Sequence, residues 1–301
     1  MTDLESLAAT LAADASYRVL RRLDLSYAGG PAIAGGDIRR AAIVDVETTG
    51  MDRQDDQIIE LGVVVFEYLA GSGETGPVVG RYSGFEDPGR PIPPSSTRIH
   101  GITDEMVRGH RLDEAAVTAV LAGVDLVIAH NAGFDRPFLE ARLPVFTALP
   151  WACSLRDVAW KDHGVGSSAL EFLAYRAGFF YDAHRAQMDC LALLAVLAHA
   201  IGDTGKPALR ALLERARESS YRIAALRSHF DTKDLLRARG YRWNADVRVW
   251  AVEIPAAARE AELAWLKQAV YGGRDAEVEI ETLTAQERYS GRDGQRERVR
   301  I

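Results

Sequence analysis

The chain has 301 residues, 48% of them hydrophobic, and a formal net charge of −7 at pH 7. These values exclude a largely disordered chain and allow one large core with a smaller second unit. The acidic balance excludes a generally basic protein that coats nucleic acid, but not an enzyme with an acidic centre. Cys153 and Cys190 form no C-x-x-C pair, which argues against a disulfide framework or a thiolate zinc site. No segment is apolar over the length of a bilayer, so we expect a cytoplasmic protein without a membrane partner.

The first elements predicted along the chain are helical. Apolar residues recur at helical spacing between residues 4 and 23, which predicts one or two amphipathic helices in an N-terminal helical extension over 1–36.

Three β-rich segments with the short connections of antiparallel strands are predicted at 41–50, 57–68 and 78–85. Prolines then predict an extended loop at 88–96. After the loop, the pattern predicts a helix at 104–122, a strand at 126–130 and helices at 135–142, 169–177 and 185–200.

This order of elements predicts an α/β fold in which a mixed sheet is flanked by helices, over residues 37–203. Glycine and proline between 202 and 207 predict a linker. The β-α-β-β-α-β order over 207–285 predicts a small α+β module, ferredoxin-like or related. Residues 286–301 are charged and lack apolar periodicity, which predicts a flexible tail.

Two carboxylates interrupt the first apolar β-rich segment. Because side chains alternate along a strand, Asp45 and Glu47 project on the same side, about 6 to 7 Å apart. Half-buried acids repel each other unless a cation lies between them, and Mg²⁺ and Mn²⁺ prefer carboxylate oxygens. The alternative is an edge strand whose acids face water, so residues elsewhere must decide between the two.

Four further residues have the chemistry of a site. Asp135 follows the apolar strand at the start of a helix, where an acid is also favoured by the helix dipole alone. Asp189 shares the apolar face of its predicted helix, and a buried acid is costly unless it is paired or binds a metal. His184 lies in the loop or first turn before Asp189. His100 is followed by a glycine, which indicates either close backbone approach at a site or a tight turn.

Three motifs together resemble the DEDDh family of 3′–5′ exonucleases, which includes the proofreading (epsilon) subunit of bacterial DNA polymerase III. They are D-x-E-T-T-G at 45–50, N-x-x-F-D at 131–135 and H-x-x-x-x-D at 184–189. The resemblance covers about residues 38–202 and implies a ribonuclease-H-like fold. It also implies an enzyme that hydrolyses phosphodiester bonds from the 3′ end of DNA and releases nucleoside 5′-monophosphates.

The same resemblance implies the cofactors and the roles of residues. Two divalent metal ions, Mg²⁺ or Mn²⁺, would be held by four carboxylates, with His184 as the general base. Phe134 is among the residues implied near the substrate, although we expect it to lie in the core. The carboxylates are those of Asp45, Glu47, Asp135 and Asp189, and the implied substrate-binding residues are Thr48, Thr49, His100, Asn131 and Phe134.

The expected partner is a single-stranded or frayed 3′ end of DNA rather than RNA. Trimming of RNA 3′ ends is one alternative, and an interaction subunit of a polymerase or repair complex, docked through 207–301, is another. Basic residues between 221 and 250 are interleaved with Tyr241, Trp243 and Trp250, a composition that suits single-strand binding. We nevertheless expect both tryptophans to pack between strands and helices.

Overall fold

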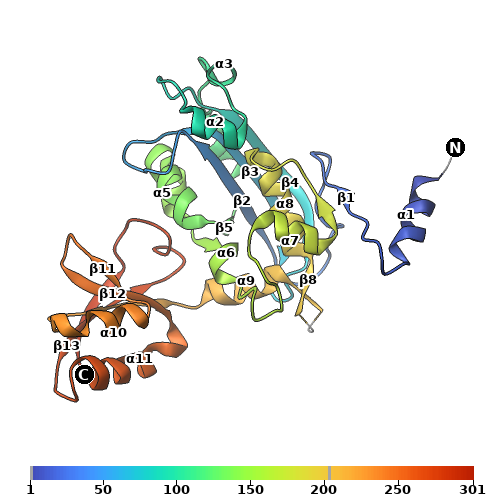
Figure 1. Ribbon diagram of the computed structural model, residues 1–301. Coiled ribbons are helices and arrows are strands. Elements are labelled where there is room, and N and C mark those ends of the chain that lie inside the picture. The colour runs from blue at the N-terminus through green and yellow to red at the C-terminus, as the bar shows by residue number, and fades with distance from the viewer. Residues whose placement is uncertain (1–2, 203–204) are drawn as a thin grey trace. The chain divides into compact units, whose positions relative to one another are not determined.

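The computed structural model describes residues 3–202 and 205–301 (Figure 1). The chain divides into two compact units, Met1–Leu213 and Glu214–Ile301, and the boundary falls within α9 (Ala208–Arg217). Residues 203 and 204 of the predicted linker lie outside the described residues. On either side of them, β8 (Ala200–Ile201) and β9 (Lys206–Pro207) form a short antiparallel pair. Within the described ranges, no helix is both long and apolar enough to cross a bilayer.

A five-stranded mixed sheet organises the first unit, in the order β4-β3-β2-β5-β6. Three successive strands, β2 to β4, are antiparallel as the sequence predicts, while β5 and β6 run parallel to β2. The mixed α/β fold class is therefore confirmed. The strands are β2 (Ile38–Thr48), β3 (Ile58–Leu69), β4 (Thr75–Phe85), β5 (Leu126–Ala129) and β6 (Trp151–Cys153).

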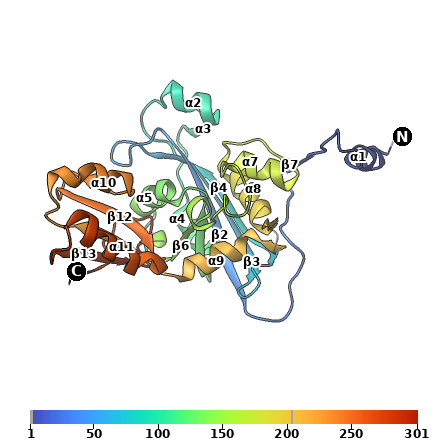
Figure 2. The ribbon, with the colours of Figure 1, turned by 60° about the horizontal axis from the view of Figure 1, so that its bottom comes forward.

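The centre of this sheet is covered on both faces. Nearly every residue of β3 is buried, which explains its continuous apolar sequence in place of an alternating one. Helix α8 (Ala186–Ala198) packs along β2 and β3, and α7 (Leu170–Ala177) lies beside it (Figures 1 and 2). Helix α5 (Ala132–Arg142) contacts β2, β5 and β6. The short elements α6 (Ser154–Asp157) and the 3₁₀ helix Pro144–Ala148 complete this region.

Two predictions between β4 and β5 are wrong. The segment expected as a loop at 88–96 already enters α2 (Pro94–His100), because proline is tolerated in the first helical turn. Gly101 ends α2 with φ 71°, so the glycine after His100 is a left-handed helix cap. The single helix expected at 104–122 is two helices, α3 (Asp104–Val107) and α4 (Glu114–Val120), separated at Gly109 with φ 71°.

The N-terminal extension is helical only at its start, in α1 (Leu4–Ala12), and this helix has no buried residue. The residues that follow α1 in the extension are not helical. They are held to the domain by hydrogen bonds, and not by the packing of an apolar helical face. The Arg18 guanidinium donates to the carbonyls of Tyr175 and Arg176 at 2.6 and 3.1 Å. Strand β1 (Arg21–Arg22) pairs in parallel with β7 (Phe179–Phe180), just before the His184 loop. The prediction of helix up to residue 23 is therefore wrong.

The second unit has a five-stranded antiparallel sheet in the order β11-β12-β10-β13-β14. Its first four strands and two helices follow the predicted β-α-β-β-α-β order, and their sheet order is that of a ferredoxin-like split β-α-β. The strands are β10 (Ser220–Ala225), β11 (Arg242–Asn244), β12 (Val249–Pro255), β13 (Glu277–Leu283) and β14 (Gln295–Arg300). The helices are α10 (Lys233–Ala238) and α11 (Arg259–Trp265), with 3₁₀ helices at Phe230–Thr232 and Ala256–Ala258 and a π-helical turn at Leu266–Val270.

The flexible tail predicted over 286–301 is wrong, because its end forms β14. Three arginines of β14 lie opposite three glutamates of β13 in the antiparallel register. In the sequence, the same arginines contribute to the charged pattern that predicts disorder. The pairs are Glu277 with Arg300, Glu279 with Arg298 and Glu281 with Arg296. Opposite charges across a strand pair are stabilising, and Val299 packs against the core of the unit.

The two tryptophans of the second unit differ in burial. Trp250 packs partly buried against the core, as expected. Trp243 lies opposite Trp250 on the neighbouring strand, with ring centroids 5.7 Å apart, but is 51% exposed. The expectation that Trp243 is packed is therefore wrong, because β11 is an edge strand and, among the described residues, no further strand pairs with its outer side.

Candidate active site

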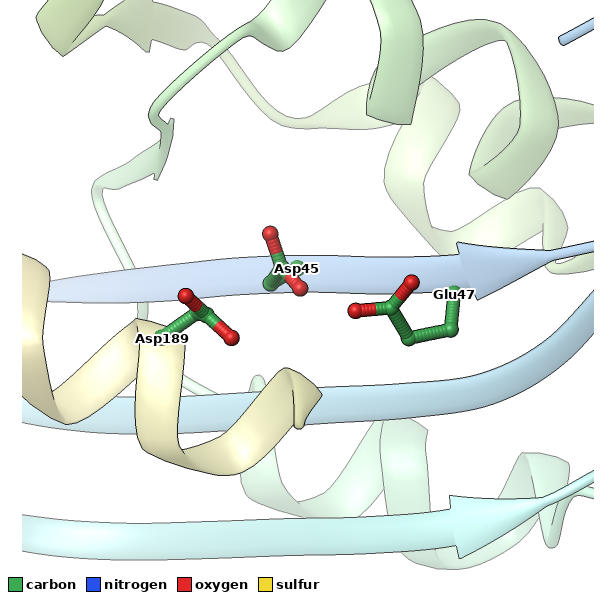
Figure 3. A group of neighbouring side chains, drawn as sticks. All are labelled: Asp45, Glu47 and Asp189. Carbon is green, nitrogen blue, oxygen red and sulfur yellow. The ribbon is translucent and has the colours of Figure 1, made fainter. Parts of the chain in front are cut away.

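Three carboxylates from two elements converge in the first unit (Figure 3). Asp45 and Glu47 project from the same side of β2, and Asp189 reaches toward them from the first turn of α8. One oxygen of each carboxylate lies within 4.8 Å of those of the other two. This spacing suits oxygen ligands around a hard divalent cation.

Gly62 explains why α8 can lie so near β2. It is the partner of Asp45 in the β2–β3 register, and an added Cβ would lie 2.5 Å from the Gln187 backbone nitrogen. The N-terminal turn of α8 therefore rests directly on the backbone of β3, where the Cys190 thiol donates to the Gly62 carbonyl at 3.5 Å. The sequence interpretation missed this residue, although a glycine inside a valine-rich strand is a signal of close backbone approach.

Asp135 lies beside this cluster but has a different immediate partner. Its side chain is 3% exposed, and its Oδ1 accepts a hydrogen bond from the Val46 backbone N–H at 3.1 Å. Val46 stands between the two acids of β2, so this bond ties the first turn of α5 to the centre of the cluster. Asp135 is not one of the three residues whose oxygens lie within 4.8 Å.

The four predicted carboxylates have raised pKa values, and burial is the largest cause in each. Burial and the neighbouring charges of Asp135, Asp189 and Glu47 raise the pKa of Asp45 well above its usual range. The pKa rises to about 8 for Glu47, to about 7 for Asp135 and to about 6 for Asp189. Burial and mutual repulsion disfavour the ionised form of these carboxylates. A divalent cation, which prefers oxygen ligands, would neutralise their charges.

Two groups beyond the predicted set hold Asp189. The Tyr181 hydroxyl donates to Oδ1 at 3.1 Å, and the Arg185 backbone N–H donates to Oδ2 at 3.0 Å. Burial raises the pKa of Asp189, whereas these two bonds and the charge of His184 act in the opposite direction. The sequence interpretation missed Tyr181, which precedes the H-x-x-x-x-D motif and has no distinguishing pattern of its own.

Glu60 is a fifth carboxylate next to the cluster, and it was also missed. It lies opposite Glu47 in the β2–β3 register and is 2% exposed. It forms an ion pair with Arg185 at 3.1 Å and accepts from the Ala186 backbone N–H at 3.2 Å. A charged residue in the middle of an apolar strand is a usable signal, but its arginine partner lies far away in sequence.

His184 precedes α8 in an exposed bend and has φ 64°. Left-handed backbone is unusual for a residue that is not glycine, and such conformations gather at functional sites. The conformation turns the chain into α8 between the exposed loop and the buried first turn. His184 is therefore next to the cluster but open to solvent.

The threonines of the D-x-E-T-T-G motif are engaged by their own loop. The Thr48 hydroxyl donates to the Gly50 carbonyl at 2.6 Å. The Thr49 side chain is 1% exposed, and its hydroxyl donates to Asp56 at 2.8 Å and accepts from the Gln57 backbone N–H at 3.1 Å. The Thr49 side chain thus shapes the loop after β2 from within.

His100 is buried at the end of α2, with 6% of its surface exposed. Its Nδ1 accepts from the Ile102 backbone N–H at 3.0 Å, while its Nε2 is buried without a hydrogen-bond partner among the described residues. Burial lowers the pKa of His100, the charge of Glu60 acts in the opposite direction, and the charge of nearby His184 lowers the pKa further. An unsatisfied buried nitrogen is uncommon and marks a place where a ligand or water can bind.

Phe134 lines an open pocket of about 510 Å³ and is only half-buried. Its ring centroid lies 5.1 Å from that of Phe138, and the loop residues Met51 and Arg53 also line the pocket. The expectation that Phe134 belongs to the core is therefore wrong, because α5 presents it to the pocket. Asn131 is exposed before α5, and its side chain makes no capping hydrogen bond.

Comparison with known proteins agrees with this site. A family model described as Exonuclease matches residues 42–197. DNA polymerase III subunit epsilon of Treponema pallidum (strain Nichols) is 30% identical over 197 residues, which cover 58% of this chain and 88% of that protein. DNA polymerase III PolC-type of Thermotoga maritima is 35% identical over 111 residues, which are 36% of this chain but only 8% of that protein.

Two solved structures are also similar. Exonuclease X in complex with 5′ overhanging duplex DNA is 27% identical, with a TM-score of 0.40, and the match covers 52% of this chain and 89% of that one. E. coli Exonuclease I in complex with a dA16 oligonucleotide is 15% identical, with a TM-score of 0.48, and the match covers 72% and 64% of the two chains. The family match, which includes all four predicted carboxylates, shows that the chain belongs to the exonuclease family, as a 3′–5′ exonuclease of the DEDD type.

Proposed function

We propose that this exonuclease hydrolyses DNA from a free 3′ end, with two divalent metal ions, and releases nucleoside 5′-monophosphates. The observation that carries the proposal is the convergence of the Asp45, Glu47 and Asp189 oxygens within 4.8 Å of one another. The name of the epsilon-subunit relative supports DNA as the substrate.

The carboxylates Asp45, Glu47, Asp135 and Asp189 would hold the metal ions, Mg²⁺ or Mn²⁺. Asp45 has the central place in this proposal, because the charges of the other three all raise its pKa. Two divalent cations held by these carboxylates would supply an activated water and would neutralise charge on the scissile phosphate. Asp135 also keeps α5 in place through its bond to the Val46 backbone.

His184 is the proposed general base, which accepts the proton of the attacking water. Imidazole is the side chain most often used as a general base, and the exposed position of His184 leaves it open to solvent and substrate. Tyr181 and the Arg185 backbone hold the Asp189 carboxylate in one orientation. These contacts support a site whose ligands are fixed before substrate binds.

The terminal nucleotide is proposed to bind beside the carboxylates, with its base against Phe134 in the pocket of about 510 Å³. Thr48 and its neighbouring backbone are proposed to hold the sugar of this nucleotide, and Asn131 is proposed to lie near the scissile end. The buried Nε2 of His100 offers a hydrogen bond that no described residue satisfies. Thr49 contributes by holding the loop after β2, since its hydroxyl is already bonded to Asp56.

The test is degradation of matched single-stranded DNA and RNA oligonucleotides, labelled at the 5′ end, with Mg²⁺ and with Mn²⁺. We expect His184→Ala to lower the rate of DNA cleavage by about 100-fold or more, which is the usual contribution of a general base. We expect Asp189→Ala, which removes a metal ligand, to lower the rate by at least as much. Asp162→Ala, at an exposed aspartate, is the matched control. Undiminished cleavage by either site variant would sink the mechanism, and faster cleavage of RNA would reverse the substrate assignment.

Action within a polymerase or repair complex is a second proposal, and the name of the epsilon-subunit relative supports it. In that case the isolated chain cleaves slowly, and a polymerase that co-purifies with it raises the rate. Equal rates with and without any co-purifying protein would remove this proposal and leave the exonuclease activity intact.

A further inference from the structure

We propose that the second unit carries its own binding site for the phosphodiester backbone of a single nucleic-acid strand, in a pocket at one end of its sheet. The pocket has a volume of about 780 Å³ and is formed where β10 ends, β12 and β13 begin and β14 ends. Five arginines line it, Arg227, Arg248, Arg274, Arg298 and Arg300. This site is separate from the exonuclease centre and does not rest on the activity proposed there.

The pocket has an excess of positive charge within an acidic chain, since five arginines and two carboxylates, those of Asp275 and Glu277, line it. Within the described ranges, no carboxylate pairs with Arg227, Arg248 or Arg274. The other two arginines are compensated, since Arg300 pairs with Asp275 at 2.9 Å and Arg298 with Glu279 at 3.6 Å. The Arg274 Nε donates to the Tyr271 carbonyl at 3.2 Å, so Arg274 can offer its two terminal nitrogens to an anion, beside the guanidinium groups of Arg227 and Arg248. A guanidinium binds phosphate oxygens through two parallel hydrogen bonds.

The backbone holds two of these arginines in an unusual conformation. Arg227 has φ 53° and Arg248 has φ 52°, a left-handed region that favours glycine. The turn before Arg248 is fixed by the Asn244 side chain, which accepts from the backbone N–H groups of Asp246 and Val247 at 3.0 and 3.3 Å. Both exposed arginines therefore lie in turns with a defined backbone conformation at the edge of the pocket.

Cross-strand pairs compensate charges of β10, β13 and β14. Along β13 and β14, glutamates and arginines alternate in direct opposition and compensate each other. Arg222 on the neighbouring strand pairs with Glu281 at 2.7 Å. The charges of β13 and β14 are thus balanced, whereas the arginines of the pocket outnumber its carboxylates.

An exposed aromatic residue close in the strand ladder to a pocket-lining residue favours a nucleic-acid strand over an isolated phosphate. Trp243 is 51% exposed and is one ladder step from the pair of Asn244 with Val249, and Val249 lines the pocket. Arginines that contact phosphates and an aromatic ring that stacks a base are the combination found in single-strand binding sites.

The experiment measures binding of a fluorescein-labelled DNA 20-mer to the full chain in EDTA, where no cleavage occurs. We expect the triple variant R227A/R248A/R274A to bind at least about tenfold more weakly. The slope of log affinity against log salt should also fall by about 2, from about 0.7 per phosphate contact on a single strand. The matched control R222A/R259A/R296A removes the same charge from arginines that already pair with carboxylates, at 2.7, 2.7 and 3.6 Å.

Two further arms separate the sources of binding. Trp243→Ala should weaken binding of the DNA strand and leave the salt slope unchanged, because stacking releases no counterions. Inorganic phosphate should compete only weakly with the 20-mer. Equal losses in the two triple variants, or an unchanged slope in the first, would overturn the site, while thermal unfolding checks that each variant is folded. Because binding is read without metal, failure here leaves the exonuclease proposal standing.

Discussion

Asp45 and Gly62 lie opposite each other in the β2–β3 pair, and the glycine leaves the space through which α8 brings Asp189 to the aspartate. Gly62→Ala places a Cβ 2.6 Å from the Ala186 carbonyl oxygen, so the helix must move away. We expect this substitution to lower the free energy of unfolding by about 1–3 kcal/mol, the usual cost of overpacking. A displacement of about 1 Å at the cluster should lower the cleavage rate by about 100-fold.

Gly71→Ala is the control for that variant, because an added Cβ at Gly71 meets no atom within 4 Å. Urea unfolding and the cleavage assay should both be close to wild type for this control. A Gly62→Ala protein with wild-type activity would show that the distance between α8 and β2 does not limit the reaction.

The Tyr181 hydroxyl bonds Asp189 at 3.1 Å, and its removal should weaken metal binding without abolishing the reaction. Groups that orient a metal ligand typically contribute about 10- to 100-fold in affinity. For Tyr181→Phe, we therefore expect activity against Mn²⁺ concentration to shift to higher concentration by that factor, with nearly full activity at saturation. A lower plateau with an unchanged midpoint would mean that Tyr181 acts on the substrate and not on the ligand.

Much of the cluster follows from local sequence. Alternation along a strand puts Asp45 and Glu47 on one side, and an acid on an apolar helical face marks Asp189. The contacts that fix these residues are non-local and do not follow from spacing. The pairing of Glu60 with Arg185 joins residues 125 positions apart, and the bond from Val46 to Asp135 joins residues 89 apart.

Register and packing partners explain the errors at both ends of the chain. From sequence alone, the charged residues before Ile301 predict disorder. In the structure they form β14, where three arginines lie opposite glutamates of β13. Conversely, residues 4–23 have helical periodicity, but only α1 is helical and it buries no residue. Periodicity predicts an amphipathic surface, whereas the element that covers this surface is determined elsewhere in the chain.

The ion pair of Glu60 with Arg185 should matter for stability. Arg185→Ala leaves Glu60, 2% exposed, beside Glu47 with a backbone N–H as its remaining partner. We expect a loss of about 2 kcal/mol, below the about 3–5 kcal/mol of a fully buried pair, because the Arg185 side chain is 46% exposed. Urea unfolding of the metal-free protein measures this loss.

The double variant Glu60→Gln/Arg185→Ala is the control for this ion pair. It removes both charges, so most of the lost stability should return. If the stability losses of Glu60→Gln and Arg185→Ala add up to the loss of the double variant, Glu60 and Arg185 do not interact.

The raised pKa values of the cluster predict that the metal-free protein becomes less stable as pH rises. In the unfolded chain these carboxyl groups release their protons near pH 4, whereas in the folded chain the pKa of Glu47 is about 8 and that of Asp135 about 7. The folded state therefore binds more protons between these limits, and the free energy of unfolding falls across this window as pH increases. Asp45→Asn should flatten the fall, and Mg²⁺ at pH 8 should offset it. Thermal unfolding in EDTA from pH 5 to pH 8 measures the effect, and a melting temperature that rises over this range would contradict it.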